Sequence, residues 1–162
     1  MPDGPRYEDD FYAWTQHQAE VSRTMPVLDN RFDREHVAEE IEDLGKSERD
    51  AVRSEIRRII EHLLKLAYSL AVQSRFDWMY SVSDARAALE DKLSPTLCRD
   101  VEATLERLYA QARRNATVSL GNFGEHGAAP AFPDKCPYSL DKICQQDWYP
   151  ISPEHDPQTE VR

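Results

Sequence analysis

The stretch HVAEEIEDLGKSERD, residues 36–50, decides how the chain folds, because it carries both a helical pattern and a candidate helix break. Apolar residues recur in it at the three- and four-residue steps of an α-helix, and the pattern continues along the chain without a change of phase. The residues that share this stripe are Val37, Ile41, Leu44, Ala51, Val52, Ile59, Leu63, Leu66 and Leu70. We therefore expect one long helix over about residues 33–71, in which Gly45 could introduce a kink.

Gly45 also allows a second interpretation. A glycine often follows the end of a helix, and Ser47 with Asp50 resembles a capping box that would start another helix. Lys46 alone would then link the two helices, which is too short for most hairpins. We favour a single helix for this reason, and a hairpin at Gly45 is the alternative.

Further helices are expected around the long one, because each has an apolar stripe at helical spacing or a capping residue at its start. They cover about residues 8–23, 76–93, 95–120 and 140–146. Asp9 or Asp10, Ser94 and Ser139 are the expected caps, and Gly121 is the expected end of the fourth main helix. The predicted fold class is all-α: a bundle of about four main helices, one of them long, with a short C-terminal helix. Residues 1–150 form a single helical domain in this prediction, and residues 151–162 a disordered tail.

The composition agrees with an all-α fold and narrows the classes of partner. Of 162 residues, 40% are hydrophobic and 31% are charged, and only 5 are Gly. The formal net charge of −10 would repel a phosphate backbone, so we expect no direct binding of nucleic acid or of an anionic membrane. The sequence shows no apolar run long enough to span a bilayer and no signal peptide. We expect a cytoplasmic protein in which Cys98, Cys136 and Cys144 are reduced.

Several motifs spread over the chain occur together, in this order, in one known family. They are YEDDFYAWTQHQAE (7–20), VAEEIEDLGKSERD (37–50), EHLLKL (61–66), the helix from Trp78 to Arg86, and FPDKCPYSLDKI with DWYP (132–150). With them the chain resembles the bacterial family catalogued as domain of unknown function 29, common in cyanobacteria and proteobacteria. The resemblance implies a small α-helical bacterial protein without an established activity, and it supplies no catalytic residues. The chain departs from the family pattern in a longer segment at 121–131, expected to be a surface loop, and at Leu66, where the family pattern leads us to expect Trp.

Winding the long helix separates its acidic residues into two groups. The acids that point away from the apolar stripe, and are expected on a solvated face, are Glu39, Glu42 and Asp43. Glu40 lies at the edge of the stripe and Glu48 near its centre. Glu55 and His62 follow Glu48 at seven-residue steps, so they share its face.

Carboxylates on a packing face need partners, because burying an unpaired charge is costly. Arg86 and Arg113 on the later helices are the expected partners. One interpretation is a layer of ion pairs between packed helices or subunits. Another is a functional polar pocket in the bundle, formed by Glu40, Glu48, His62 and Arg86. A third is that the phase of the helix drifts and these residues are simply solvated.

A single metal ion shared by these residues is not expected. At a rise of 1.5 Å per residue, Glu40 and Glu48 lie about 12 Å apart along a straight helix, and Glu48 and His62 about 21 Å. Asp33, His36 and Glu40 form a tighter set, but the repeated Glu-x-x-His pattern of di-metal bundles is missing from the sequence. Nucleophile-elbow and phosphate-loop motifs are missing as well, so we expect neither catalytic residues nor a cofactor.

The sequence names no reaction, and three classes of function are open. The first, which we favour, is a non-catalytic bacterial helical protein that acts through protein–protein contacts or self-association. A helix of nearly 40 residues would be about 60 Å long, more than a compact domain of this size spans, so part of it could pack against another copy. The second is a metal- or small-ligand-binding bundle, or an enzyme, that uses the polar pocket. The third is a regulator of nucleic-acid transactions that acts as an acidic mimic or binds a basic partner.

Overall fold

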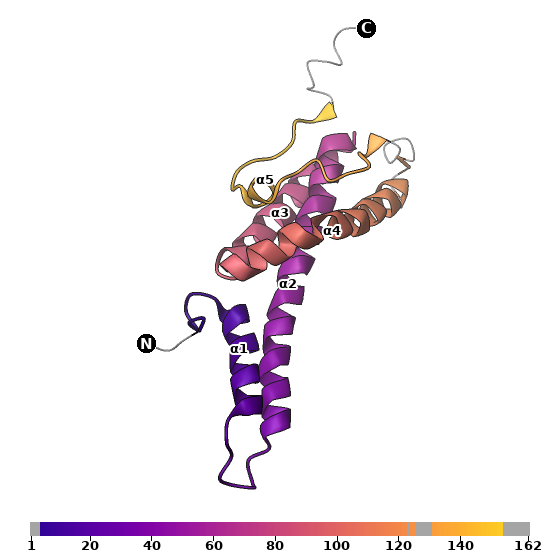
Figure 1. The fold of residues 1–162 in the computed structure, drawn as a ribbon. Coiled ribbons are helices and arrows are strands. Elements are labelled where there is room, and N and C mark those ends of the chain that lie inside the picture. Colours follow the sequence, from indigo (N-terminus) through magenta and orange to yellow (C-terminus); the bar gives the residue numbers. More distant parts are fainter. Residues whose placement is uncertain (1–3, 123, 126–130, 154–162) are drawn as a thin grey trace. The chain divides into compact units, whose positions relative to one another are not determined.

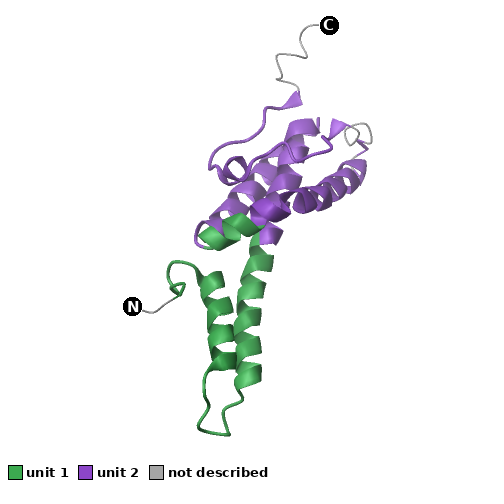
Figure 2. Cartoon of the chain, in the orientation of Figure 1, with its two compact units in different colours: residues 1–52, 92–100 green, residues 53–91, 101–162 purple. Residues whose placement is uncertain are grey.

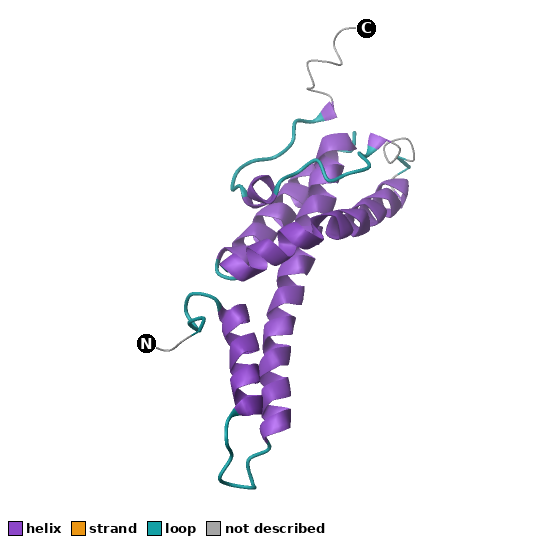
Figure 3. Ribbon diagram, in the orientation of Figure 1, coloured by secondary structure: helices purple, strands orange, loops and turns teal. Residues whose placement is uncertain are grey.

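The computed structural model describes residues 4–122, 124–125 and 131–153. Within these ranges the regular elements are helices (Figure 1 and Figure 3), so the prediction of an all-α fold is confirmed. In chain order they are α1 (Phe11–Thr24), α2 (Arg34–Tyr68), the 3₁₀ helix η1 (Val72–Ser74), α3 (Arg75–Glu90), α4 (Pro95–Asn122) and α5 (Leu140–Cys144). None of these described helices is both long and apolar enough to cross a membrane.

Polar side chains cap three helices at residues that the sequence predicted. The carboxylate of Asp10 accepts a hydrogen bond from the backbone N–H of Ala13 at 3.0 Å, at the start of α1. The hydroxyls of Ser94 and Ser139 accept from the backbone N–H three residues further on, at 3.3 Å and 3.2 Å, at the starts of α4 and α5. These bonds satisfy N–H groups that the first turn of a helix leaves without a partner.

Two helix ends differ from the prediction. α2 ends at Tyr68 rather than near residue 71, and its last turn is closed by Arg75, whose Nη1 donates to the carbonyl of Leu66 at 2.7 Å. α4 continues past Gly121, and the backbone instead turns at Gly124, where φ is +78°. A contact from outside α2 closes its end, and a glycine beyond the helix turns the chain after α4. A local pattern such as the position of Gly121 does not predict either feature.

α2 runs through Gly45 without interruption, so the prediction of one long helix is confirmed and the hairpin alternative is wrong. Gly45 is buried against α1: a Cβ at this position would lie 2.0 Å from Oγ1 of Thr15 and 2.7 Å from Nε2 of Gln16. Glycine inside a helix costs about 0.5–1 kcal/mol relative to alanine. At Gly45 this cost is offset by the close approach of the two helices that it permits.

The chain divides into two compact units (Figure 2). Unit 1 comprises residues 1–52 and 92–100, and unit 2 comprises residues 53–91 and 101–162. A single helical domain over residues 1–150 stays a prediction beside this division. The predicted disordered tail, 151–162, lies outside the described residues from position 154 onward.

In unit 1, α1 and the first part of α2 run side by side in opposite directions, as a helical hairpin (Figure 1). The buried residues of this hairpin are small or of moderate size: Thr15, Ala19, Ala38, Gly45 and Val52. Those of α2 recur every seventh residue, which is the spacing of a single contact line between two helices. The large residues Val37 and Leu44 of the predicted packing stripe are exposed. The contact line is therefore rotated away from that stripe.

The core of unit 2 gathers larger apolar side chains from α2, α3, α4 and the C-terminal segment. Its buried apolar residues are Ile56, Ile59, Ile60, Leu63, Leu64, Leu66, Trp78, Val82, Ala85, Leu89, Val101, Leu108, Tyr109, Ala112, Ala116, Leu120, Phe132, Leu140 and Ile143. Leu66, which departs from the family pattern, is completely buried, so the change affects core packing. The predicted surface loop at 121–131 falls largely outside the described residues.

Candidate functional site

The structure reverses the predicted placement of two acids of α2. Glu40, expected at the edge of the packing face, is exposed. Glu42, expected in solvent, is half-buried: it accepts a hydrogen bond from Nη2 of Arg23 at 2.5 Å and lies 2.9 Å from Nζ of Lys46. The bond from Arg23 lowers the pKa of the Glu42 carboxyl. Both placements were wrong because α2 packs on α1 through its small residues and not through the centre of its apolar stripe.

Glu48 is half-buried, but its partner differs from the prediction. Its carboxylate lies 3.9 Å from Nζ of Lys92, which belongs to the same unit. The expected partners make other contacts, and Arg113 donates to the carbonyl of Phe132 at 3.2 Å. Within unit 1 the partner of Glu48 is thus Lys92, and a pairing with Arg86 or Arg113 stays a prediction.

Arg86 is almost completely buried, with 2% of its surface exposed, and it binds main-chain oxygens. Its Nε donates to the carbonyl of Ile143 at 2.8 Å, Nη1 to Trp148 at 2.9 Å and Nη2 to Lys142 at 3.5 Å. The ring of Tyr149 lies 5.4 Å from its guanidinium carbon. Burial lowers the pKa of Arg86. Arg86 thus anchors α5 and the segment that follows it to α3.

His62 lies on the part of α2 that belongs to unit 2, with its ring largely shielded from water. Its Nδ1 is buried and has no hydrogen-bond partner among the described residues. Burial lowers the pKa of His62 to about 4, and the nearby cations Lys65 and Arg58 act in the same direction while Glu61 opposes them. The imidazole is therefore neutral at pH 7.

The four residues of the predicted polar pocket are divided between the two units. Glu40 and Glu48 belong to unit 1, and His62 and Arg86 belong to unit 2. Glu48 and Arg86 bind other residues within their own units, and the pocket stays a prediction. Over the described ranges, no group of three or more His, Cys, Asp or Glu side chains is placed to hold a metal ion.

The hairpin of unit 1 has a polar side on which its two helices bind each other. Nε2 of Gln16 donates to the main-chain carbonyl of Glu42 at 3.2 Å. The Glu42 carboxylate, beside it, is held by Arg23 from α1 and by Lys46 from its own helix. The acid that lies between the helices on this side is thus neutralised within the hairpin.

Apolar side chains gather on the opposite side of the hairpin when both helices are wound at 100° per residue. This open side consists of Phe11, Trp14 and Val21 of α1, Met25 at the C-cap of α1, and Val37, Ile41 and Leu44 of α2. Leu44 is 59% exposed, and Val21, Met25 and Val37 are exposed as well. A soluble helix usually turns such a stripe toward a core, so this surface is suited to contact with another element.

Residues 92–100 cover one end of the open side. Within unit 1, Lys92 reaches Glu48, and the backbone N–H of Thr96 donates to the carboxylate of Asp10 at 2.9 Å. Glu48 lies one turn beyond Leu44, and Asp10 immediately precedes α1. A third segment of unit 1 therefore lies over this end of the hairpin, while Leu44 and Val37, nearer the connecting loop, are exposed.

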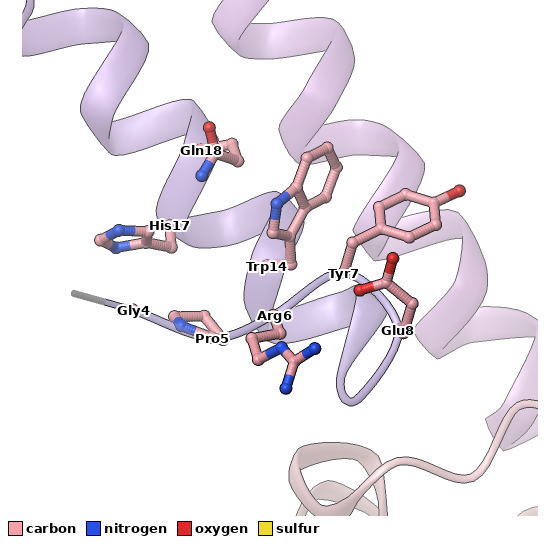
Figure 4. A pocket seen from close by; sticks show the side chains of 8 residues that line it. All are labelled: Gly4, Pro5, Arg6, Tyr7, Glu8, Trp14, His17 and Gln18. Carbon is pink, nitrogen blue, oxygen red and sulfur yellow. The ribbon is translucent and has the colours of Figure 1, made fainter. Parts of the chain in front are cut away.

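A cavity of about 240 Å³ lies where the N-terminal segment folds back along α1 (Figure 4). Tyr7 packs edge-on against Trp14, with ring centroids 4.9 Å apart. The backbone at Gly4 passes so close to His17 that a Cβ would lie 2.5 Å from its Nε2. Both aromatic and polar side chains line this cavity, and together they do not indicate one class of ligand.

Comparison with known proteins identifies the family of the chain. The family model described as "Domain of unknown function DUF29" matches residues 6–149, which is most of the chain. The chain belongs to the DUF29 family. This match confirms the resemblance that the sequence motifs indicated. No curated protein matches this DUF29 chain.

A solved structure is similar to this DUF29 chain over nearly its whole length. It is the crystal structure of an alpha-helical protein of unknown function from Rhodospirillum rubrum ATCC 11170. The two chains are 26% identical, the match covers 90% of this chain and 92% of that chain, and the TM-score is 0.77. The similarity supports the all-α fold, and it indicates no activity because the function of the other protein is unknown.

A second apolar surface of this DUF29 chain lies in unit 2. Phe76 and Tyr80, one turn apart on α3, are 80% and 75% exposed. Val72 of η1 is exposed next to them in sequence. Exposed aromatic residues are enriched at protein interfaces, so this surface is a further place for a contact.

Sequence reasoning missed the open side of the DUF29 hairpin, although a signal for it was present. The small residues Ala38 and Gly45 and the buried Val52 recur every seventh residue, and they mark the direction in which α2 meets α1. Val37 and Leu44 directly precede two of them, about 100° away around the helix. A helix with small contact residues and a separate row of large apolar residues has a second face to cover.

Proposed function

We propose that this DUF29 chain is a non-catalytic protein that acts through protein–protein contact, with the open side of the unit 1 hairpin as its contact surface. The observation that carries the proposal is the 59% exposure of Leu44 among apolar neighbours on two helices. Burying a Leu or Val side chain fully contributes about 1.5–3 kcal/mol. A partner that covers Leu44 and its neighbours therefore gains a substantial hydrophobic contribution to binding.

The proposal includes self-association as well as contact with a different protein, because either occupant would remove the same apolar side chains from water. A bacterial cytoplasmic location is part of it. Cys98, Cys136 and Cys144 form no disulfide with one another, which is compatible with a reducing compartment.

The alternative function, a ligand-binding bundle or an enzyme built on Glu40, Glu48, His62 and Arg86, has less support. The donors of Arg86 are engaged by three main-chain carbonyls. Glu40 is exposed and Glu48 faces Lys92. The buried Nδ1 of His62 is the feature that still favours a polar role for this set.

Site-specific crosslinking tests the proposed function. A photoreactive amino acid replaces Leu44 in one variant and Val118 in another, and both are expressed in the bacterium that encodes the chain. Val118 is a matched control because it is also an aliphatic helical residue, 65% exposed, and lies on α4. We expect position 44 to give a discrete adduct, with a second copy or with one other protein, in clear excess over position 118.

The proposal fails if position 44 gives no adduct, or gives the same spread of adducts as position 118. Light scattering on the purified chain separates the two kinds of contact, because self-association raises the molar mass above that of one chain. The mass should then return to that of a monomer in Leu44→Gln and stay raised in Val118→Gln.

A further inference from the structure

We propose that the open side of the hairpin receives an amphipathic helix of a partner protein whose apolar stripe is flanked by Lys or Arg on the side next to α2. This inference rests on the proposed function and names the chemistry of its partner. It follows from the shape of the open side, from the segment that already covers one end of it, and from the charges along its margin.

The shape of the open side fits a helix. Two rows of apolar side chains, one on each helix of an antiparallel pair, form the groove that a third helix occupies in a helical bundle. Tyr7 of the N-terminal segment already packs on Phe11 and Trp14, so the open part of the α1 row begins beyond these two residues. Residues 92–100, which include the start of α4, already lie over one end of this groove. The exposed part from Val37 to Leu44 spans two turns of α2, about 10 Å. A partner helix of three to four turns would continue the layer that residues 92–100 begin.

The charges along the margin specify the flank of the partner helix. On the polar side of the hairpin, Glu42 is neutralised by Arg23 and Lys46. At the margin of the open side, Asp33, which precedes α2 and pairs with His36 at 2.6 Å, and Glu40 follow one another at a two-turn interval, and both are exposed. Glu40 forms no ion pair with another described residue. Charge complementarity therefore places basic residues on the partner flank that lies beside α2.

The α1 margin of the open side has a different character. Around Trp14 its polar residues are His17 and Gln18 with Arg6 and Glu8 of the N-terminal segment, and the charges of Arg6 and Glu8 are opposite in sign. The partner helix therefore needs its basic residues on one flank only.

A second copy of this chain is less suited to bind the open side. The chain has a net charge of −10, and Arg34, which lies beside Asp33 at this end of α2, already donates to the carbonyl of Met25 and pairs with Glu35.

Three synthetic helical peptides of about five turns provide the probe. All carry fluorescein. The basic peptide has a Leu and Ile stripe with Lys and Arg along one flank. The acidic peptide has the same stripe with Glu at the flank positions. The scrambled peptide has the composition of the basic peptide without a stripe. By fluorescence anisotropy at moderate salt, we expect the full chain to bind the basic peptide with micromolar affinity, at least about tenfold more tightly than the other two.

Two pairs of variants locate the binding. Leu44→Gln should weaken binding of the basic peptide by about tenfold or more, while Val118→Gln, the same kind of change on α4, should leave it unchanged. Glu40→Gln should weaken it by a few fold and reduce its dependence on salt, while Glu102→Gln, an exposed acid of α4, should do neither. All four substitutions are at exposed helical positions, and far-UV circular dichroism verifies that each variant is folded.

The outcomes separate this inference from the proposed function. Equal binding of the scrambled peptide, or no effect of Leu44→Gln, would show general attraction between charges and overturn the inference. Equal binding of the acidic peptide, or no binding of the basic peptide, would overturn it as well. The proposed function survives each of these results if position 44 still crosslinks specifically to another chain. If that crosslink is also absent, both are wrong.

Discussion

A Cβ added to Gly45 would lie 2.0 Å from Oγ1 of Thr15, far inside van der Waals contact. Alanine favours a helix over glycine by about 0.8–1.0 kcal/mol, whereas overpacking a close contact costs about 1–3 kcal/mol. We expect the cost of overpacking to exceed the gain in helix propensity, so that Gly45→Ala lowers the free energy of unfolding by about 1–2 kcal/mol. Urea denaturation measures the change.

Ser47→Ala is the matched control, because Ser47 is exposed two residues further along α2. Ser47→Ala should leave the stability unchanged or raise it slightly, because alanine has a higher helix propensity than serine and no close contact opposes it. Thr15→Ala should recover part of the loss when combined with Gly45→Ala. If the two changes are strictly additive, Thr15 is not the group that excludes a Cβ at position 45.

The contacts of the two half-buried acids of α2 predict the order of their substitutions. Glu42 is held by Arg23 and Lys46 at 2.5 Å and 2.9 Å, whereas Glu48 has Lys92 at 3.9 Å. Glu42→Ala should therefore lower the melting temperature more than Glu48→Ala does. Thermal unfolding at low and high salt tests this order, and an equal or reversed effect would contradict it.

Arg86 is the side chain whose replacement should loosen the C-terminal segment. Arg86→Lys keeps the charge but cannot direct donors to Ile143, Trp148 and Lys142 at once. Charge-assisted hydrogen bonds contribute about 1.5–3 kcal/mol each, so a loss of roughly 2–4 kcal/mol in unfolding free energy is expected. Limited proteolysis should cut within residues 139–150 more readily than in wild type.

Arg107→Lys serves as the comparison for Arg86→Lys, because Arg107 is exposed on α4. It should change neither the stability nor the rate of proteolysis. Unchanged protection of residues 139–150 in Arg86→Lys would show that other contacts, such as the ring packing of Tyr138 against Trp148, hold the segment.

His62 should make the protein less stable in acid. Its pKa is about 4 in the folded chain, against an ordinary value of 6.5. As the pH falls from 6.5 to 4, the unfolded imidazole binds a proton that the folded one does not, so the free energy of unfolding decreases. The loss is roughly 1–2 kcal/mol when solvent screening of the partly exposed ring is allowed for. The difference in stability between wild type and His62→Gln should shift by this amount between pH 7 and pH 4.

His36 should act with the opposite sign and provides the control. Its Nδ1 lies 2.6 Å from the carboxylate of Asp33, and this bond raises the pKa of His36 above 6.5. The folded chain then binds the proton more tightly, so His36 contributes stability below pH 6.5 and loses that contribution as the pH rises through its folded pKa. His36→Gln should therefore be destabilising at pH 6 and neutral at pH 9. A stability difference that does not change with pH would be inconsistent with the pairing.

Helix positions were predictable from the sequence because their signals are local. Asp10, Ser94 and Ser139 each cap a helix through a backbone group three residues away, and the apolar spacing identifies the rest. The direction in which α2 packs was not predictable in the same way. It depends on α1 meeting the short side chains at Ala38 and Gly45, a property of two helices together.

The contacts of the predicted site residues were harder still to foresee. Arg86 was expected to meet a carboxylate, because a sequence shows which side chains are present but not which backbone carbonyls lie near them. Its partners are the carbonyls at positions 142, 143 and 148, and every residue has such a group. Glu40 was placed inward by the average phase of a helix of 35 residues, but the local contact line on α1 is what orients this part of α2.

The use of carbonyls by Arg86 also bears on how the C-terminal segment can change during evolution. Main-chain oxygens do not alter when a side chain is replaced, so Lys142 and Trp148 can be exchanged without removing the acceptor that Arg86 requires. One arginine on α3 can thus hold a segment in place while the exposed residues of that segment diversify. Within the family, substitutions at these two positions should therefore be compatible with the same anchored conformation, whereas replacement of Arg86 should require a compensating change in the backbone path.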